Sequence, residues 1–344
     1  MGVRDFTFYN LIRRNAICFP NRCAWLEDAD RLSVTYVQYK EMVDRAASGL
    51  QRLGVAKGDR VGVIGKNGLE YFVVYGAAAA LGAIVLPINW RLSPEEIVVN
   101  LNDCTPKIVF VDKEYESLIL EQRKKVSYVE EFFTLDQGNG EWSNFGQLIK
   151  NGASYNFQEV ASDDGFVIIH TAAVGGRPKG ALLSHSNLLS TDIHLMYSLG
   201  IKPEDCHLNI LPLFHVGGLC AVMATFHAGA LNVNMRKFDS VKASELIDQR
   251  QVSLLFEFSP ILSSIMVEAE RSEWNLNSLR AVVGLDNAET IEKYQRLTNG
   301  SFFNLYGQTE VSAYVSIGRY DEKPGSAGKP LPLAEVGIVD GVDR

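Results

Sequence analysis

The stretch that most constrains the fold is residues 71–88, which read YFVVYGAAAALGAIVLPI and carry no charged side chain. Its length approaches that of a membrane span. Gly76, Gly82 and Pro87 interrupt it, however, and its composition changes midway. We therefore predict a buried, alanine-rich helix followed by an interior strand at 83–86, and no transmembrane segment.

Helix and strand signals alternate along the rest of the chain. Thr35 with Gln38, and Ser93 with Glu96, have the spacing of capping boxes that begin helices. Further helices are predicted at 36–53, 187–199, 217–227, 240–250 and 289–297. Apolar strands are predicted at 61–64, 107–111, 166–170, 207–211, 231–233, 252–256, 281–283 and 301–304. Continuous apolar strands between helices indicate sheets covered on both faces, so we predict an α/β protein.

The chain divides into three predicted parts. Residues 1–160 form an N-terminal α/β subdomain, and a more polar stretch at 121–164 is interpreted as the junction to the next part. Residues 161–319 form a second α/β subdomain. From residue 320 onward Pro and Gly punctuate the chain, and a strand is expected at 336–339.

Composition and charge narrow the function classes. Lys and Arg number 33 against 41 Asp and Glu, which gives a net charge of -8. Because no basic stripe is present, nucleic acid is not expected as a partner. The five cysteines form no C-x-x-C pair, and the N-terminus has no apolar signal core. A reduced, cytoplasmic setting is the simplest interpretation.

Three motifs carry the candidate chemistry. TAAVGGRPKG at 171–180 follows a predicted strand; its small residues let backbone N–H groups approach phosphate oxygens, and Lys179 adds a point charge. Taken alone, this loop is better explained as an ordinary strand-to-helix turn. LYGQTE at 305–310 also follows a strand, at the carboxyl end where open α/β sheets bind ligands. LPLFH at 211–215 precedes two glycines.

Together these motifs resemble those of the adenylate-forming superfamily, in its acyl-CoA synthetase branch. The loop at 171–180 is similar to T-S-G-T-T-G-x-P-K-G, and 306–310 match Y-G-x-T-E in full. The likeness extends from about residue 35 to 340 and covers the family's large N-terminal domain. It implies a layered sandwich of two helix-covered β-sheet subdomains, with 320–344 starting a small β-barrel subdomain. The ribose-binding Asp, the hinge and the small C-terminal domain with its catalytic Lys are expected to be absent.

The resemblance also implies cofactors and residue roles. ATP, Mg²⁺ and coenzyme A are the expected cofactors. The implied catalytic residues are Lys179, His215, Thr309 and Glu310. The implied nucleotide-binding residues are Thr171, Gly175, Gly176, Lys179, Tyr306, Gly307, Gln308 and Thr309. Metal binding is implied for Glu310 and Thr171. A hard cation suits the chemistry, because attack of a carboxylate on the α-phosphate brings anions together.

Two segments depart from the family pattern. Ala172, Ala173 and Val174 stand where hydroxyl or small residues are usual, and three hydroxyl donors are lost across the loop. A hydrogen bond to a charged group contributes roughly 1.5–3 kcal/mol, so phosphate binding is expected to weaken. Asp286 replaces a small residue in the loop beside the adenine. It is either a substrate contact or, by our preferred interpretation, the cap of helix 289–297.

The predicted function is ATP-dependent activation of a carboxylic acid to acyl-AMP and transfer to coenzyme A. The apolar wall at 256–266 suits a fatty or aromatic acid. The alternative is a catalytically weakened module of the same fold that binds an acyl or nucleotide ligand. The chain by itself is expected to adenylate poorly, and a homodimer is a further expectation.

Overall fold

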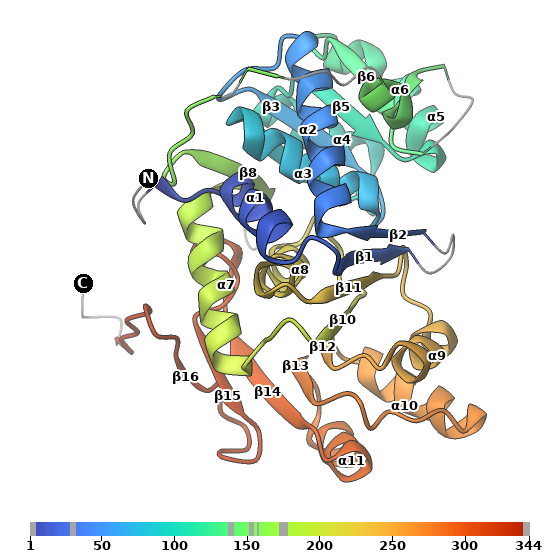
Figure 1. The fold of residues 1–344 in the computed structure, drawn as a ribbon, viewed down its shortest axis with the longest axis vertical. Helices are drawn as coiled ribbons and strands as arrows, with labels where there is room; N and C mark the ends of the chain where they lie inside the picture. The colour runs from blue at the N-terminus through green and yellow to red at the C-terminus, as the bar shows by residue number, and fades with distance from the viewer. Residues whose placement is uncertain are drawn as a thin grey trace.

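The computed structural model describes residues 5–27, 32–136, 141–150, 155–156, 158–171 and 178–339. In these residues two large sheets alternate with three layers of helices, giving five layers in all (Figure 1). The predicted class, a layered α/β sandwich of two helix-covered sheets, is confirmed.

One sheet has seven strands in the order β7-β6-β5-β3-β4-β8-β9. All neighbouring pairs are parallel except the last, where β9 runs antiparallel to β8. The bounds are β3 Arg60–Ile64, β4 Ile84–Ile88, β5 Ile108–Val111, β6 Glu131–Thr134, β7 Ser143–Asn144, β8 Gly165–His170 and β9 Gly180–Ser184.

The other sheet has nine strands in the order β16-β15-β14-β13-β12-β10-β11-β1-β2. Its strands from β14 to β1 are parallel, whereas β2, β15 and β16 are antiparallel to their neighbours. The bounds are β1 Cys23–Glu27, β2 Leu32–Thr35, β10 Cys206–Asn209, β11 Leu231–Asn234, β12 Leu254–Phe258, β13 Ala281–Leu285, β14 Ser301–Tyr306, β15 Ser316–Arg319 and β16 Lys329–Pro330.

A central layer of helices lies between the two sheets. It consists of α1 (Phe8–Cys18), α2 (Tyr36–Arg52), α3 (Leu69–Leu81), α7 (His185–Leu199) and α8 (Val216–Ala228), with α6 (Phe145–Lys150) packed against α2. These helices share one buried core with the inner faces of both sheets. In α3 every residue except Glu70 is buried, and this matches the predicted apolar helix.

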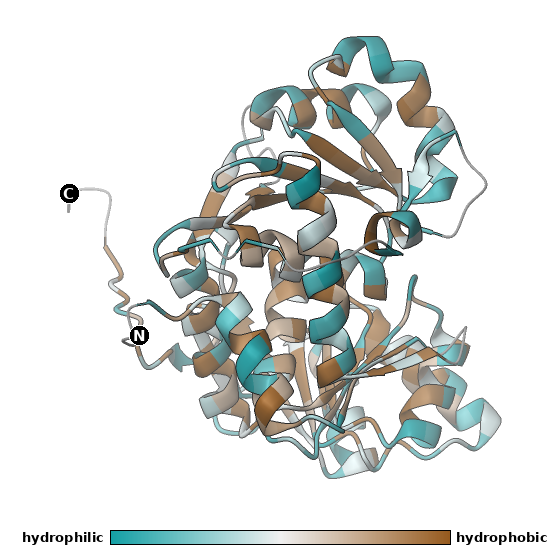
Figure 2. Cartoon of the chain, turned by 45° about the horizontal axis from the view of Figure 1, so that its top comes forward, coloured by the Kyte–Doolittle hydropathy of each residue, from teal (hydrophilic) through white to brown (hydrophobic). Residues whose placement is uncertain are grey.

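The outer faces of the sheets have separate cores. Helices α9 (Ser240–Arg250), α10 (Ile261–Ser272) and α11 (Ala288–Thr298) cover the nine-stranded sheet. Helices α4 (Pro94–Cys104) and α5 (Glu116–Gln122), with the 3₁₀ turns η2 (Lys113–Tyr115) and η3 (Arg123–Val126), lie over the seven-stranded sheet. Strand residues alternate between inner and outer cores, which explains why whole strands are apolar (Figure 2).

Local capping signals are realised where the sequence predicts them. Thr35 accepts from Gln38 N while the Gln38 side chain accepts from Thr35 N, and Ser93 with Glu96 forms the same reciprocal box. Ser184 and Asn187 form a third box, so α7 begins two residues earlier than predicted. No helix in the described part of the chain is long and apolar enough to cross a membrane.

The structure also corrects or adds to the predicted elements. The strand expected at 336–339 is wrong: these residues have no regular structure and Ile338 is fully exposed. Helix α1 and strand β1 were not predicted. The two sheets also exchange hairpins across the predicted boundary near residue 160. Strands β1 and β2 join the sheet of the later residues, and β8 and β9 join that of the earlier ones. The division into subdomains stays a prediction.

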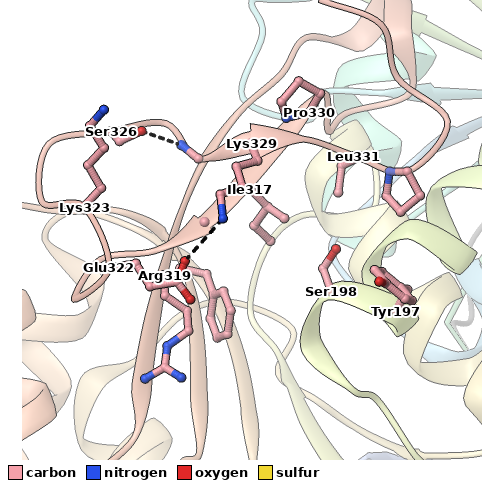
Figure 3. Close-up of a pocket in the computed structure, with 14 residues that line it drawn as sticks. Tyr197, Ser198, Ile317, Arg319, Glu322, Lys323, Ser326, Lys329, Pro330 and Leu331 are labelled. Atoms are coloured by element: carbon pink, nitrogen blue, oxygen red, sulfur yellow. Dashed lines mark hydrogen bonds and ion pairs between the residues drawn. The ribbon is translucent and has the colours of Figure 1, made fainter.

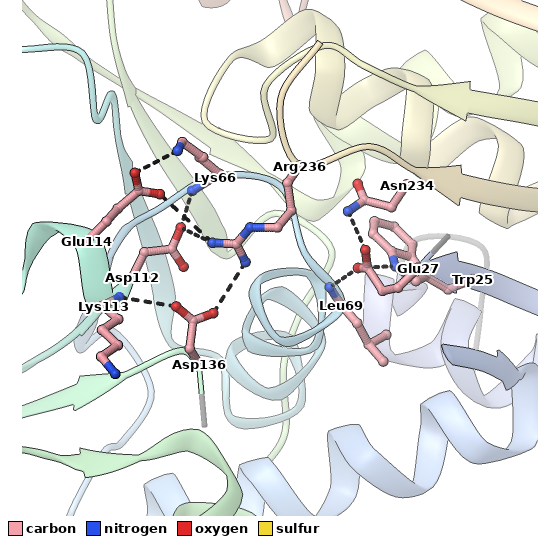
Figure 4. A network of polar contacts seen from close by, with 10 residues as sticks. All are labelled: Trp25, Glu27, Lys66, Leu69, Asp112, Lys113, Glu114, Asp136, Asn234 and Arg236. Atoms are coloured by element: carbon pink, nitrogen blue, oxygen red, sulfur yellow. Dashed lines mark hydrogen bonds and ion pairs between the residues drawn. The ribbon is translucent and has the colours of Figure 1, made fainter. Parts of the chain in front are cut away.

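Two polar bridges connect the nine-stranded sheet to the rest of the molecule (Figure 4). Arg236, which follows β11, bonds Asp112 after β5 at 3.1 Å and Asp136 after β6 at 3.3 Å. Glu27 of β1 accepts from Leu69 N, at the start of α3, at 2.7 Å. Both bridges begin where parallel strands end, and the Arg236 bridge connects the carboxyl edges of the two sheets.

The first bridge keeps a buried carboxylate charged at neutral pH. Burial raises the pKa of Asp112 to about 6, and the Arg236 charge and the Lys66 N–H oppose that rise. Gly65 leaves the room that Asp112 occupies, because a Cβ there would lie 2.9 Å from the Asp112 Cγ. The site therefore depends on Arg236 for its charge balance.

We expect Arg236→Gln to lower the free energy of unfolding by about 1–3 kcal/mol at pH 7.5, below the value for a fully buried pair because the guanidinium is partly exposed. The loss should shrink at pH 5, where Asp112 is protonated. Urea unfolding at both pH values measures it. Lys293→Gln breaks the exposed pair with Glu270 and is the control. Equal losses in the two variants would contradict the assignment.

Glu257 of β12 is a second buried acid, fully removed from solvent under α10. Burial, followed by the charge of Asp286, raises its pKa to about 8. The folded state therefore binds a proton that the unfolded state releases near pH 4.5. It follows that this group makes the protein less stable as the pH rises from about 5 to 8.

We expect Glu257→Gln to gain stability over the parent protein as the pH rises, by at most about 1.4 kcal/mol per pH unit, and to level off above pH 8. Thermal unfolding between pH 5 and 9 checks this. Glu121→Gln, which changes an exposed acid in α5, should follow the parent curve. A constant difference at all pH values would show that Glu257 is charged in the folded state.

Candidate active site

The antiparallel strands β8 and β9 carry two residues of the phosphate-loop motif. Thr171 follows β8 and Lys179 precedes β9, and the Thr171 N–H donates to the Lys179 carbonyl at 3.0 Å. Lys179 is exposed to solvent. Gly175 and Gly176 lie outside the described residues, as do Ala172, Ala173 and Val174. The structure thus shows that the two ends of the motif, at Thr171 and Lys179, are held side by side by a backbone hydrogen bond.

The Y-G-x-T-E motif forms a tight turn at the end of β14. Tyr306 ends the strand with 55% of its surface exposed, and Thr309 and Glu310 lie in the 3₁₀ turn η4 (Thr309–Val311). The Gln308 carbonyl accepts from Ala313 N at 3.1 Å. A Cβ at Gly307 would lie 1.5 Å from the Ala313 carbonyl oxygen, so the turn requires glycine there. Glu310 is exposed beside it.

The strand that follows the phosphate-loop motif contacts the turn that contains Glu310, although the two segments are more than a hundred residues apart. Strand β9, which begins directly after Lys179, lies against η4, which contains Glu310. The cationic Lys179 directly precedes one of these contacting segments, and the anionic Glu310 belongs to the other. This arrangement suits a polyanion with an associated cation, because each charge type has a partner.

His215 begins α8 as its N-cap. Its Nδ1 accepts from Gly217 N at 3.1 Å, and its ring makes an edge contact with Phe258 at 6.4 Å. The side chain is accessible to solvent, but surrounding protein atoms and then the Arg91 charge lower its pKa. The imidazole is therefore neutral at pH 7.

Tyr314 links His215 to the Y-G-x-T-E turn. Its buried hydroxyl donates to the Gly217 carbonyl at 3.1 Å, in the first turn of α8. On the other side of the loop, Thr191 of α7 donates to the Ser312 carbonyl at 2.9 Å. Neither Tyr314 nor Thr191 was predicted from the sequence. Each of these hydrogen bonds joins residues that are more than ninety positions apart in the sequence, and no local sequence pattern reveals such a contact.

The loop beside the expected adenine position corrects one prediction. Asn287, not Asp286, is the N-cap of α11, and its side chain accepts from Thr290 N at 3.0 Å. Asp286 instead accepts from the backbone N–H of Asn287 at 2.7 Å. The preferred interpretation of Asp286 as the helix cap was wrong by one residue, because Asp and Asn are both favoured N-cap residues and the sequence alone does not choose between adjacent ones.

A pocket of about 650 Å³ lies elsewhere, between the end of α7 and the β15–β16 hairpin (Figure 3). Tyr197 and Ser198 line one side, and Arg319, Lys323 and Lys329 line the other. None of the predicted site residues lines it. The candidate active-site residues therefore lie on a separate surface, near the carboxyl ends of the strands.

Comparison with known proteins shows the family to which the chain belongs. The chain belongs to the family of AMP-binding enzymes, whose model matches residues 12–343. It is 29% identical over 340 residues to an indoleacetate–CoA ligase of Aromatoleum aromaticum, covering 96% of this chain and 64% of that protein. It is 28% identical over 342 residues to a 2-succinylbenzoate–CoA ligase of Bacillus cereus, covering 98% and 67%. The chain thus spans about two thirds of the length of these curated relatives.

A solved structure agrees with the architecture. A protein of Rhodopseudomonas palustris, provisionally described as a long-chain-fatty-acid CoA ligase, has a TM-score of 0.94 and 38% sequence identity. The match covers 100% of this chain and 86% of that one. The resemblance to the adenylate-forming superfamily is therefore confirmed for the family and for the fold.

We expect Gly307→Ala to destabilise the protein by about 1–3 kcal/mol, because the added methyl group meets the Ala313 carbonyl and the turn must open. Thermal or urea unfolding measures the effect. Gly337→Ala is the matched control, since a Cβ there meets nothing within 4 Å. If both variants were as stable as the parent protein, the tight packing of this turn would be disproved.

Proposed function

We propose that this chain is the adenylate-forming part of an acid–thiol ligase, which activates a carboxylic acid with ATP and passes the acyl group to coenzyme A. The observation that supports it is the contact of β9, the strand after Lys179, with η4, the turn that contains Glu310. The hydrogen bond from Tyr314 to the Gly217 carbonyl, two residues after His215, is consistent with a role for His215 at the same surface. Membership of the AMP-binding family agrees with this proposal.

At the phosphate end, charge neutralisation carries the proposed chemistry. The Lys179 ammonium group would offset the charge of the triphosphate, and the hydroxyls of Thr171 and Thr309 would orient its oxygens. Glu310 is the exposed carboxylate of η4, and its oxygen ligand type fits Mg²⁺. When bound there, Mg²⁺ would supply positive charge to the phosphates as they approach the anionic acid.

At the acid end, His215 acts as a neutral hydrogen-bond donor. Because Nδ1 accepts from Gly217 N, the neutral ring carries its proton on Nε2. That N–H can orient the carboxylate of the acid without neutralising it. One carboxylate oxygen then attacks the α-phosphorus, the bond to pyrophosphate breaks, and acyl-AMP forms. In the second step, the coenzyme A thiol attacks the acyl carbon, and AMP leaves.

The acid itself is proposed to be aromatic or fatty. The curated relatives are named for indoleacetate and 2-succinylbenzoate, and the Rhodopseudomonas palustris structure for a long-chain fatty acid. Phe258 packs against His215, and Phe256 lies near Tyr314. Aromatic side chains beside the carboxylate end favour an acid with an apolar tail. Mg²⁺, a cytoplasmic location and a homodimer stay predictions.

We expect Lys179→Ala and Glu310→Gln each to lower acid-dependent exchange of pyrophosphate into ATP by about 100-fold or more in the complete protein that contains this chain, because each removes charge stabilisation of the phosphates. Lys202→Ala changes another exposed lysine and is the control. Exchange at parental rates in both site variants would reject the proposed roles.

Binding separates the ligase from the alternative module. A non-hydrolysable acyl-sulfamoyl adenosine, titrated by calorimetry, should bind the parent protein and stabilise it. If the protein binds this mimic tightly but no acid in a panel of aromatic and fatty acids supports exchange, the protein is a binding module. If acids support exchange, it is a ligase.

A further inference from the structure

Three metal-ligating side chains gather on the outer side of the seven-stranded sheet. Asp103 and Cys104 end α4, and His170 ends β8. One carboxylate oxygen, the thiol sulfur and one imidazole nitrogen all lie within 4.8 Å of one another. His170 Nε2 is 2.9 Å from Asp103 Oδ2, and Cys104 Sγ is 3.9 Å from that same oxygen. None of the three belongs to the proposed active site.

Burial makes this cluster more than a surface contact. Only 7% of the His170 side chain is exposed, and its buried Nδ1 has no hydrogen-bond partner within the described residues. Burial, followed by the Asp103 charge, raises the pKa of Cys104 to about 11. Asp103 remains 56% exposed, which leaves one side of the cluster open to water and ions. A cation entering there would replace the thiol proton.

The chemical types of the three ligands indicate which metal ions the cluster would bind. Mg²⁺ and Ca²⁺ prefer oxygen ligands alone, whereas one thiolate, one imidazole and one carboxylate suit Zn²⁺ and related ions. With bonds of about 2.0–2.3 Å, ligand atoms around tetrahedral Zn²⁺ are roughly 3.3–3.7 Å apart. The separations of 2.9 and 3.9 Å lie on either side of that range. The third pair, Cys104 with His170, lies within 4.8 Å, so the side chains must shift to close around an ion.

We propose that Asp103, Cys104 and His170 form a zinc-type metal site, with water as the fourth ligand. The site lies at the base of the segment that carries Lys179. His170 pairs with Gly180 across β8 and β9, and a Cβ at Gly180 would lie 3.6 Å from His170 Nε2. A bound ion clamps α4 to this hairpin directly before Thr171. The ordinary alternative is a His–Asp hydrogen bond with a bystander thiol.

Cobalt substitution tests the proposal without using enzyme activity. The complete chain, stripped with a chelator, is titrated with Co²⁺ while the thiolate-to-cobalt charge-transfer band and the visible bands of tetrahedral Co²⁺ are recorded. We expect both bands at one equivalent, and their loss when Zn²⁺ is added. Absence of a thiolate band in the parent protein would overturn the proposal.

Variants assign the ligands. Cys104→Ser should abolish the charge-transfer band and weaken Zn²⁺ binding at least 10-fold, and His170→Gln should weaken it similarly. Cys18→Ser removes an exposed cysteine elsewhere and should change neither. If His170→Gln does not fold, Asp103→Asn replaces it, because that side chain is exposed. A band that survives Cys104→Ser, or Zn²⁺ affinity that is unchanged in Cys104→Ser and in the folded ligand variant, would refute the site.

Discussion

The structure depends on the burial of two helices that are apolar all around. Nearly every residue of α3 and α8 is buried, and each helix has only one side chain that is not. A helix without a polar face must be covered on all sides. One sheet can cover only one side of such a helix, so the chain places a second sheet and further helices around it. The five-layer arrangement follows from this constraint.

Apolar burial alone does not set how the two sheets align, because it has no direction. The polar bridges supply that alignment. Arg236 connects the end of β11 to residues after β5 and β6, and Glu27 connects β1 to the start of α3 (Figure 4). These bonds act where parallel strands end. The same edges carry the candidate active site, which explains how residues from both sheets reach one surface.

The site is assembled from turns that the layers hold in place. The hairpin with Lys179 belongs to the seven-stranded sheet, and the turn with Glu310 follows a strand of the nine-stranded one. Central helices add the remaining contacts, since α7 binds the Ser312 carbonyl and α8 binds the Tyr314 hydroxyl. A change in the alignment of the two sheets would therefore change the spacing between the segment of Lys179 and the segment of Glu310. The proposed metal cluster lies behind the same hairpin and joins it to α4.

Local signals in the sequence determined much of the fold. Capping boxes at Thr35 and Ser93 marked helix starts, because their hydrogen bonds close within three residues. Continuous apolar strands identified covered sheets, and the 71–88 stretch identified a buried helix and strand. The motifs at 171–180 and 305–310 identified the family, since their residues are close in sequence.

Only the tertiary structure decided which strands pair and which side chains meet. The exchange of β1–β2 and β8–β9 between the sheets leaves no local trace, because any apolar strand can pair with another. The same holds for Tyr314 with Gly217 and for Cys104 with His170. The predicted strand at 336–339 failed for this reason: its residues have β propensity, but no partner strand lies beside them in the described structure. Propensity and capping are local, whereas pairing depends on contacts between distant residues.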